Sequence, residues 1–391
     1  MAKWLLLTGF FTLFSIANAQ ENGTYLAGKT LGKLPFLEYG LGEDRLGGAK
    51  MGFLDSNVLL KIVDSSGTDY KVKLSAAHHA YITKSSVEIL AGTKFQPYYL
   101  SNNWKVYGDS AYDYLTITLD EKLPYHAYQR IEPTRLVVDL YGVTSNTNWI
   151  TQLKTAKEIR NAWYEQLEDD VLRVYIDLRH RQHWGHWVYY DTSARARLVI
   201  RVKRQPPVLD IKKLKIAIDA GHGGDNAGAT GVNTNIEEKE YTLLIAKELQ
   251  AALKKEKVKV VMTREKDTSL TMPERIIYLH DQAPDLLVSI HLNSGSSDTI
   301  RGASTYYRYI GFRSLSQSIL KRMLELKLEE FGNVGSFNFG LNGPTDYPNC
   351  LVEVAFLSNP GDEKKVRNPA FRKAVAKKIV AGIKDWLVSL K

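Results

Sequence analysis

The feature that most constrains this chain is a short apolar run, residues 215–220, that ends in three glycines surrounding His222. The run has the length and composition of a buried strand of an α/β sheet. Open sheets of that class bind ligands just beyond the carboxyl ends of their strands, and glycine lets the backbone turn sharply there. A phosphate loop is disfavoured, because both the G-x-G-x-x-G spacing and a Gly-Lys-Ser/Thr ending are missing. The stretch predicts a first core strand that delivers His222 to a functional site, with a structural histidine bonded to backbone groups as the alternative.

Strands and helices alternate after this point. A helix is predicted over residues 238–255, where apolar residues recur at helical spacing. Thr271 and Glu274 form a capping box at the start of the next helix. Further helices are expected over residues 314–331 and from Pro369, and strands over residues 258–262, 285–290, 304–308 and 350–356. Residues 213–391 are therefore predicted to form a three-layer α/β domain, with a mostly parallel central sheet flanked by helices.

Short alternating segments fill residues 25–100. Apolar residues recur at every second position on both sides of a Ser-Gly turn at Gly67, which predicts a small all-β unit. Its order of strands and turns resembles a bacterial SH3-like module, a small barrel. His78 and His79 are adjacent and would point to opposite faces of a strand, so we expect them to be solvated in a connecting loop.

An internal echo occupies residues 102–203. A strand, a polar connection and a second strand occur twice, over residues 114–140 and again over residues 172–202, which predicts a β-sandwich of two related halves. The pattern resembles the AMIN domain, a β module of periplasmic envelope proteins that binds or localises to peptidoglycan. Two prolines then mark residues 204–212 as a linker.

Three histidines within this region, His180, His183 and His186, have a spacing that could suggest a metal site. They fall in a connection between two predicted strands, in a segment that also carries Arg and Trp. We predict a solvated hairpin.

The first nineteen residues have the features of a secretory signal. Lys3 precedes an apolar run that is short for a membrane span, and Ala17 and Ala19 form an A-x-A cleavage site, with an uncleaved anchor as the alternative. Cys350 is the one cysteine, so no intramolecular disulfide can form. We expect a secreted, periplasmic protein with no stable membrane span after signal cleavage. The net charge of +9 is spread along the chain without a basic and aromatic cluster, which argues against nucleic-acid binding.

Four residues with side chains suited to chemistry lie in or next to the core elements. His222 follows the first strand, Glu238 begins the first long helix, His291 follows another strand, and Glu353 lies inside a third. Two imidazoles and one carboxylate are the protein ligands of a catalytic zinc that keeps a position open for water. A further carboxylate can take the proton of that water. Glu353 suits this role, because burying an unpaired charge inside an apolar strand is costly unless the charge has a partner such as the metal site.

Five short motifs strengthen this interpretation because they occur together and in order: residues 219–224, 238–246, 263–264, 289–293 and 352–359. They resemble the successive motifs of the zinc-dependent N-acetylmuramoyl-L-alanine amidases of the Amidase_3 family. The resemblance implies that His222, Glu238 and His291 bind Zn²⁺ and that Glu353 is the catalytic base. It also implies hydrolysis of the amide between N-acetylmuramic acid and L-alanine of the peptidoglycan stem peptide. Glu237 is the alternative metal ligand.

Other family members carry a helical insertion that covers the zinc until an activator removes it, and this chain lacks the residues for it. We therefore expect an open active site, controlled by the amino-terminal modules, and an envelope or divisome activator remains a candidate partner. Asn293 and residues 338–343 are candidates for substrate contacts. The rival classes are a cysteine peptidase using Cys350, disfavoured because that residue opens a buried strand and not a helix, and an envelope-binding protein with an inactive amidase domain.

Overall fold

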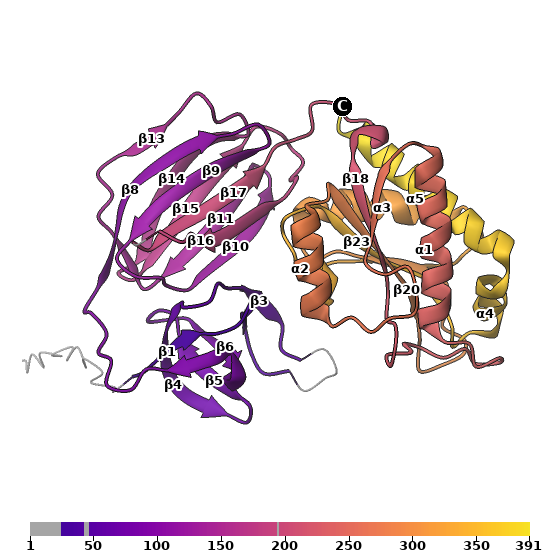
Figure 1. The fold of residues 1–391 in the computed structure, drawn as a ribbon, viewed down its shortest axis with the longest axis horizontal. Coiled ribbons are helices and arrows are strands. Elements are labelled where there is room, and N and C mark those ends of the chain that lie inside the picture. Colours follow the sequence, from indigo (N-terminus) through magenta and orange to yellow (C-terminus); the bar gives the residue numbers. More distant parts are fainter. Residues whose placement is uncertain (1–24, 43–46, 194) are drawn as a thin grey trace, which may run out of the picture.

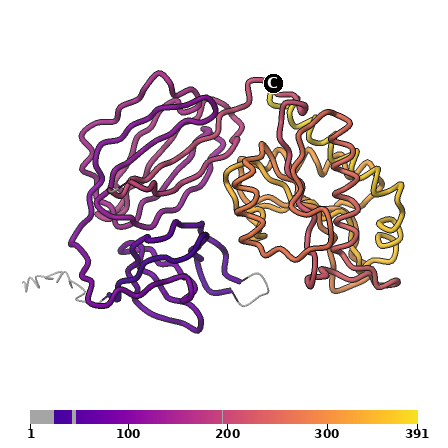
Figure 2. The backbone as a smooth tube through the Cα atoms, in the orientation of Figure 1, coloured from indigo at the N-terminus to yellow at the C-terminus, as the bar shows by residue number. Residues whose placement is uncertain are grey.

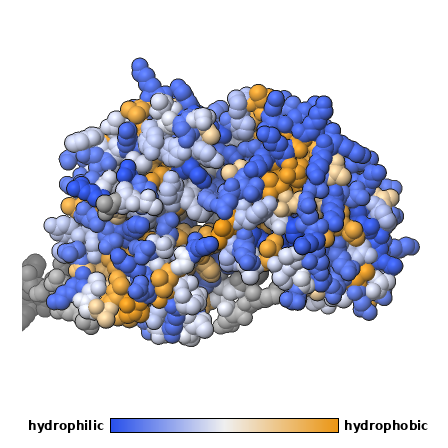
Figure 3. All heavy atoms as spheres, viewed as in Figure 1, coloured by the Kyte–Doolittle hydropathy of each residue, from blue (hydrophilic) through white to orange (hydrophobic). Residues whose placement is uncertain are grey.

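The computed structural model describes residues 25–42, 47–193 and 195–391. The signal-peptide prediction over residues 1–19 lies outside these residues. The described chain forms two β regions followed by an α/β domain, which Figure 1 and Figure 2 show side by side. Polar residues cover most of the face seen in Figure 3. Among the described helices, none has both the length and the apolarity needed to cross a membrane.

The first β region is a sheet that has seven strands in the described residues, in the order β3-β2-β6-β5-β4-β1-β7. We call it the amino-terminal sheet. Its strands are β1 (Leu26–Thr30), β2 (Phe36–Glu38), β3 (Lys50–Phe53), β4 (Leu59–Ser66), β5 (Asp69–Lys73), β6 (His79–Thr83) and β7 (Val87–Ile89). Leu37, Leu60 and Ile82 are at most 1% exposed and form its core. His78 and His79 are exposed, as predicted.

The second region is the predicted sandwich. Its described strands form one sheet in the order β10-β11-β15-β14 and another in the order β12-β8-β9-β17-β16, with β13 paired to β8. The bounds are β8 (Tyr99–Gly108), β9 (Tyr112–Leu119), β10 (Tyr125–Ile131), β11 (Thr134–Tyr141), β12 (Val143–Ser145), β13 (Ile150–Gln152), β14 (Ile159–Glu168), β15 (Val171–Leu178), β16 (His186–Tyr190) and β17 (Arg197–Lys203). The two copies of the internal echo interlock, because β9 of the first pairs with β17 of the second while β11 pairs with β15.

The α/β domain is built on a sheet in the order β19-β18-β20-β23-β21-β22. Its described pairings are parallel except that β21 runs antiparallel to β23. The strands are β18 (Lys215–Ala220), β19 (Lys259–Met262), β20 (Leu286–Asn293), β21 (Ala303–Tyr306), β22 (Glu330–Val334) and β23 (Asn349–Phe356). The helices are α1 (Glu238–Lys255), α2 (Met272–Gln282), α3 (Arg313–Leu324), α4 (Pro360–Arg367) and α5 (Pro369–Ser389).

Both faces of this sheet are buried, which explains why its strands are apolar throughout. Ile216 and Ile218 pack in the core shared with α1, α3 and α5, whereas Ala217 packs in a separate cluster with Ile276 and Leu279 of α2. Helices therefore cover the sheet on both sides (Figure 1).

One helix prediction was too long. The helix expected over residues 314–331 ends at Leu324, and residues 330–334 form the edge strand β22 instead. Lys327 takes a left-handed φ of 57°, which ends the helical path, and the chain then returns along the sheet with Leu328 buried. The sequence prediction also missed α4.

The prediction of a solvated hairpin around His183 and His186 was wrong. Both side chains are buried, because the neighbouring Trp184 inserts into the core of the α/β domain beside Trp386, with ring centroids 5.1 Å apart. Burial lowers the pKa of His183 to about 4 and that of His186 to about 3, so both imidazoles are neutral at pH 7. His180 remains exposed and pairs with Glu158 at 2.6 Å.

Candidate metal centre and active site

The site lies where β18 ends. The strand stops at Ala220, and His222 takes a left-handed φ of 60°. That conformation is unfavourable for a non-glycine residue, so the surrounding contacts must hold it. The guanidinium of Arg275 donates to the carbonyls of both Ala220 and His222. Arg275 of α2 therefore fixes the loop that carries His222.

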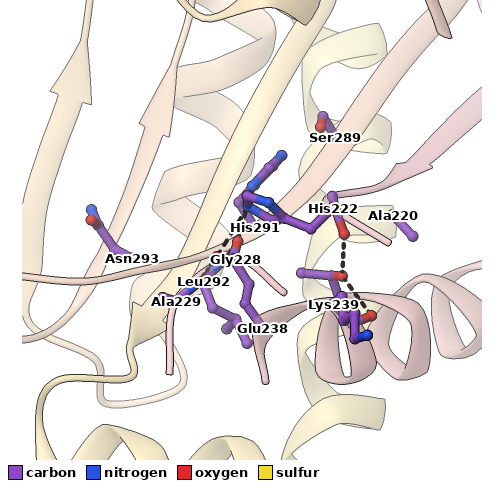
Figure 4. Close-up of polar contacts among 12 residues, drawn as sticks. Ala220, His222, Gly228, Ala229, Glu238, Lys239, Ser289, His291, Leu292 and Asn293 are labelled. Carbon is purple, nitrogen blue, oxygen red and sulfur yellow. Dashed lines mark hydrogen bonds and ion pairs between the residues drawn. The ribbon is translucent and has the colours of Figure 1, made fainter. Parts of the chain in front are cut away.

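Glu238, the first residue of α1, lies between the two histidines (Figure 4). Its Oε2 is 3.1 Å from Nε2 of His222, and its Oε1 is 3.0 Å from Nδ1 of His291. The backbone N–H groups of Ala229 and Leu292 donate to the same two oxygens at 2.8 and 2.9 Å. The carboxylate is thus held at both oxygens and cannot easily leave the pair of imidazoles.

The charges of this cluster stabilise one another. Burial opposes ionisation of Glu238, but its hydrogen bonds to the two histidines outweigh burial and hold its pKa well below the usual range. Burial likewise disfavours the His291 imidazolium, yet the hydrogen bond and charge of Glu238, with smaller contributions from Glu353 and Asp219, raise the pKa of His291 to about 9. The Glu238 carboxylate attracts positive charge to the space between the two histidines, and a metal cation could supply that charge.

The described residues contain one group of His, Cys, Asp or Glu side chains that could share a metal ion, and it consists of His222, Glu238 and His291. Their candidate ligand atoms lie within 4.8 Å of one another. Nδ1 of His222 lies 2.9 Å from Oδ1 of Asn226, an oxygen that only accepts. Nδ1 of His222 must therefore carry a proton, so Nε2, the nitrogen that faces Glu238, is the one available to a metal. The residues present fit a divalent transition metal.

Glu237, the alternative ligand, lies outside this group. Its side chain is 43% exposed and pairs with Lys239 at 3.2 Å, whereas Glu238 is 3% exposed. The structure therefore places Glu238 with the histidines.

Glu353 approaches the same cluster from the neighbouring strand. It lies directly opposite His291 in the parallel pairing of β20 and β23, so the two side chains share one face of the sheet. Glu353 is 6% exposed and lines the same groove as the three clustered residues. A proton acceptor thus lies beside the candidate metal position.

Two buried arginines and Asp219 support the loop after β18. Arg275 forms a 2.5 Å ion pair with Asp219, which also accepts from Ser289 and Thr263 at 2.6 and 2.7 Å. Arg264 donates to the carbonyls of Ala220 and Gly221. The sequence prediction included Asp219 and Arg264 in its motifs but missed Arg275 and Asn226. The position of Arg275 beside Ile276, on the apolar face of α2, could have indicated a buried arginine. No sequence signal indicated a role for Asn226.

The glycines around His222 pack against protein, and not against open space for a substrate. A Cβ on Gly221 would lie 2.4 Å from Cε1 of His291, and one on Gly224 would lie 2.1 Å from Oγ of Ser269. Gly223 has a φ of 131°, which a residue with a side chain rarely adopts. Their role is close packing of the loop against the second histidine and the bracing residues.

The cluster opens into a groove of about 870 Å³. Asn293 and Asn338–Gly340 line it, as do Met272 and Pro273 at the start of α2. No long insertion interrupts the described chain here, because β21 ends at Tyr306 and α3 begins at Arg313. The groove is also lined by residues of the amino-terminal sheet, which sequence reasoning did not predict.

Comparison with known proteins identifies the α/β domain. The model of the N-acetylmuramoyl-L-alanine amidase family, Amidase_3, matches residues 216–385, and the AMIN domain model matches residues 103–205. An N-acetylmuramoyl-L-alanine amidase of solved structure from Clostridium difficile 630 is 33% identical, over 46% of this chain and 98% of that one. The α/β domain belongs to the N-acetylmuramoyl-L-alanine amidase family. From here we call it the amidase domain, and the family expected from the five motifs is confirmed.

Other relatives agree with this assignment. The catalytic domain of CwlV from Bacillus (Paenibacillus) polymyxa is 31% identical over 46% of this chain and 99% of that one. The TM-score is 0.43 for the CwlV structure and 0.44 for the Clostridium difficile structure. The probable cell wall amidase LytH of Staphylococcus saprophyticus is 33% identical over 48% of this chain and 64% of its own length. The chain thus matches less than two thirds of that relative. All four candidate residues fall within the range matched by the amidase family.

Proposed function

We propose that this chain is a zinc-dependent N-acetylmuramoyl-L-alanine amidase, which hydrolyses the amide joining the lactyl group of N-acetylmuramic acid to L-alanine of the stem peptide. The observation that carries the proposal is the placement of Glu238 between His222 and His291, with Glu353 beside them, inside a domain of that family. An inactive amidase domain would not need to keep all four groups together.

His222, Glu238 and His291 would hold the zinc, a ligand set that this metal takes in hydrolases. When bound, zinc polarises the scissile carbonyl, lowers the pKa of a water and stabilises negative charge on the carbonyl oxygen. Other groups of the chain orient these ligands. Asn226 fixes the tautomer of His222, and the two backbone N–H groups on Glu238 fix the position of its carboxylate.

Glu353 is the proposed general base. Its carboxylate accepts the proton of the attacking water and then delivers that proton to the nitrogen of L-alanine as the amide bond breaks. Its position opposite His291 on the adjacent strand keeps it on the metal-facing side of the sheet. Because it comes from a central strand, its backbone position is rigidly defined.

A cysteine peptidase is disfavoured by strand geometry. Cys350 and Glu353 are three residues apart in β23, so their side chains point to opposite faces. Cys350 packs in the core with Val352 and Val354, and burial strongly raises the pKa of its thiol. A buried neutral thiol on the far side of the sheet cannot attack a substrate in the groove.

The setting that we propose is the bacterial envelope, with export to the periplasm and peptidoglycan as the polymer that is bound and cut. The AMIN match next to the amidase domain supports this location. The direct connection from β21 to α3 supports activity without an activator that removes an internal plug.

The test is mass spectrometry of peptidoglycan digested by the purified full chain, with and without a chelator. We expect stem peptides with a free L-alanine amine, lost on chelation and restored by Zn²⁺. Glu353→Gln should retain zinc while amide cleavage falls by about 10²- to 10⁴-fold, the range for loss of a general base. Glu237→Gln, beside the cluster and exposed, is the matched control and should cleave normally. Full activity of Glu353→Gln would refute the assignment of the base.

A further inference from the structure

The amino-terminal sheet forms part of the wall of the active-site groove. Leu34, Phe36, Lys50 and Phe53 line the same groove as His222 and Glu353, although about 170 to 320 residues separate them in the chain. Figure 1 shows β3 on the side of the amino-terminal sheet that faces α2 of the amidase domain. A module that sequence alone suggests is a separate unit thus contributes side chains next to the chemistry.

Local geometry explains why these side chains face the groove. In β2, Leu37 is buried in the core of the amino-terminal sheet, so its neighbour Phe36 faces outward. Lys50 and Phe53 of β3 are three residues apart, which in a regular strand would place them on opposite faces. A bulge in the register between β2 and β3 adds a residue at this point and allows both to face the groove.

The amidase domain holds Lys50 by its backbone. Oδ1 of Asn338 accepts from the N–H of Lys50 at 3.2 Å, Nδ2 of Asn338 donates to the carbonyl of Gly48 at 2.8 Å, and the guanidinium of Arg308 donates to the carbonyl of Lys50. Phe53 packs against the cluster that contains Leu341 and Tyr347. Asn338, a predicted substrate contact that also lines the groove, thus docks the amino-terminal sheet.

The side chain of Lys50 is left to face the groove. Its ammonium lies 4.9 Å from the centre of the Phe36 ring, which also lines the groove. Glu38 is opposite Lys50 in the strand pairing and its charge interacts with that of Lys50, but its carboxylate also lies against Gly48 and is not part of the groove lining. A fixed, half-buried cation beside aromatic rings favours a carboxylate ligand, because charge-assisted hydrogen bonds strengthen where water is partly excluded.

We propose that the amino-terminal sheet completes the substrate-binding groove and that Lys50 binds a carboxylate of the stem peptide, while Phe36 and Phe53 contact its apolar parts. This inference rests on the proposed amidase function, whose substrate is a peptide with free carboxylates. It makes the first β region a determinant of substrate specificity, in addition to any role in localisation.

The test compares the full chain with its Lys50→Met variant on a soluble muropeptide and on the same muropeptide with its peptide carboxylates amidated. We expect Lys50→Met to raise KM for the acidic substrate by about 10- to 100-fold, the value of one hydrogen bond to a charged group, with kcat nearly unchanged. Amidation should raise the KM of the wild type to the same degree and should leave Lys50→Met unaffected. Lys50→Arg should recover most of the affinity, which excludes a folding defect as the cause.

Lys71→Met is the matched control, since Lys71 is a half-buried lysine of the same sheet that does not line the groove. Its KM should equal that of the wild type. An unchanged KM for Lys50→Met, or losses from mutation and amidation that add independently, would overturn the inference while leaving the amidase function intact. If the wild type cleaved neither substrate, the proposed amidase function would be refuted, and the proposed role of Lys50 would be refuted with it.

Discussion

Replacing Asp219 by Asn should unlock the loop that carries His222. Asp219 is 1% exposed and lies at the end of β18, where it pairs with Arg275, itself 4% exposed. The Asn amide keeps the shape of the carboxylate but removes its charge, so Arg275 becomes a buried cation without its partner. Removing one partner of a buried ion pair destabilises by about 3–5 kcal/mol. The effect should be concentrated in β18 and the loop after it, because Arg275 also donates to the carbonyls of Ala220 and His222.

The same ion pair predicts a pH dependence. Burial would raise the pKa of Asp219, but Arg275 outweighs it, with help from His291, Ser289 and Thr263, so the net pKa is lowered. A group with a lowered folded-state pKa stabilises the fold above its unfolded-state pKa of about 4 and loses that contribution as the pH falls through the folded-state value. The stability difference between wild type and Asp219→Asn should therefore be full at pH 7 and shrink below about pH 4.

Hydrogen exchange followed by mass spectrometry measures this directly. At pH 7 the amides of β18 should exchange about 150- to 4,000-fold faster in Asp219→Asn, the factor that corresponds to 3–5 kcal/mol. Melting temperatures at pH 7 and pH 3 should show the difference narrowing in acid. Asp281→Asn removes an exposed carboxylate from the same helix as Arg275 and serves as the control. Exchange of β18 within threefold of the wild type would show that the ion pair does not support this loop.

Two further predictions concern the residues next to the metal cluster. Gly221→Ala places a Cβ against the His291 ring and should displace that ring, so the affinity for zinc should fall by at least about tenfold, as expected for an overpacked site. Isothermal titration with Zn²⁺ measures the affinity. Gly40→Ala is the control, because a Cβ at Gly40 meets no atom within 4 Å. Cys350 should resist iodoacetamide in the folded protein and react fully in urea, because it is 1% exposed and burial raises the pKa of its thiol. Labelling of the native protein with loss of cleavage would revive the cysteine mechanism.

Local signals predicted the elements that carry the site. The helix expected over residues 238–255 is α1, with the same bounds, because an apolar face at helical spacing and an acidic first turn both act within the element. The capping box of Thr271 and Glu274 is present as predicted. The helix prediction failed beyond Leu324, because the left-handed Lys327 and the strand pairing of β22 override local propensity.

Contacts between distant segments account for the other errors. His183 and His186 resemble solvated residues because their segment is polar, yet Trp184 carries them into the interface with the amidase domain. The glycines around His222 predict a sharp turn, but each also packs against a segment that sequence spacing cannot place beside it.

The amino-acid sequence by itself determined the family, most of the strands and helices in the amidase domain, and the chemical candidates His222, His291 and Glu353, with Glu238 or its neighbour Glu237 as the fourth. These inferences rest on motifs and periodicities that are complete within short segments. Only the tertiary structure decided that Glu238 and not Glu237 meets the histidines, that Arg275 and Asn226 orient them, and that Lys50 faces the same groove. Those relations depend on packing between elements, since the side chains that meet there are separated by up to about three hundred residues.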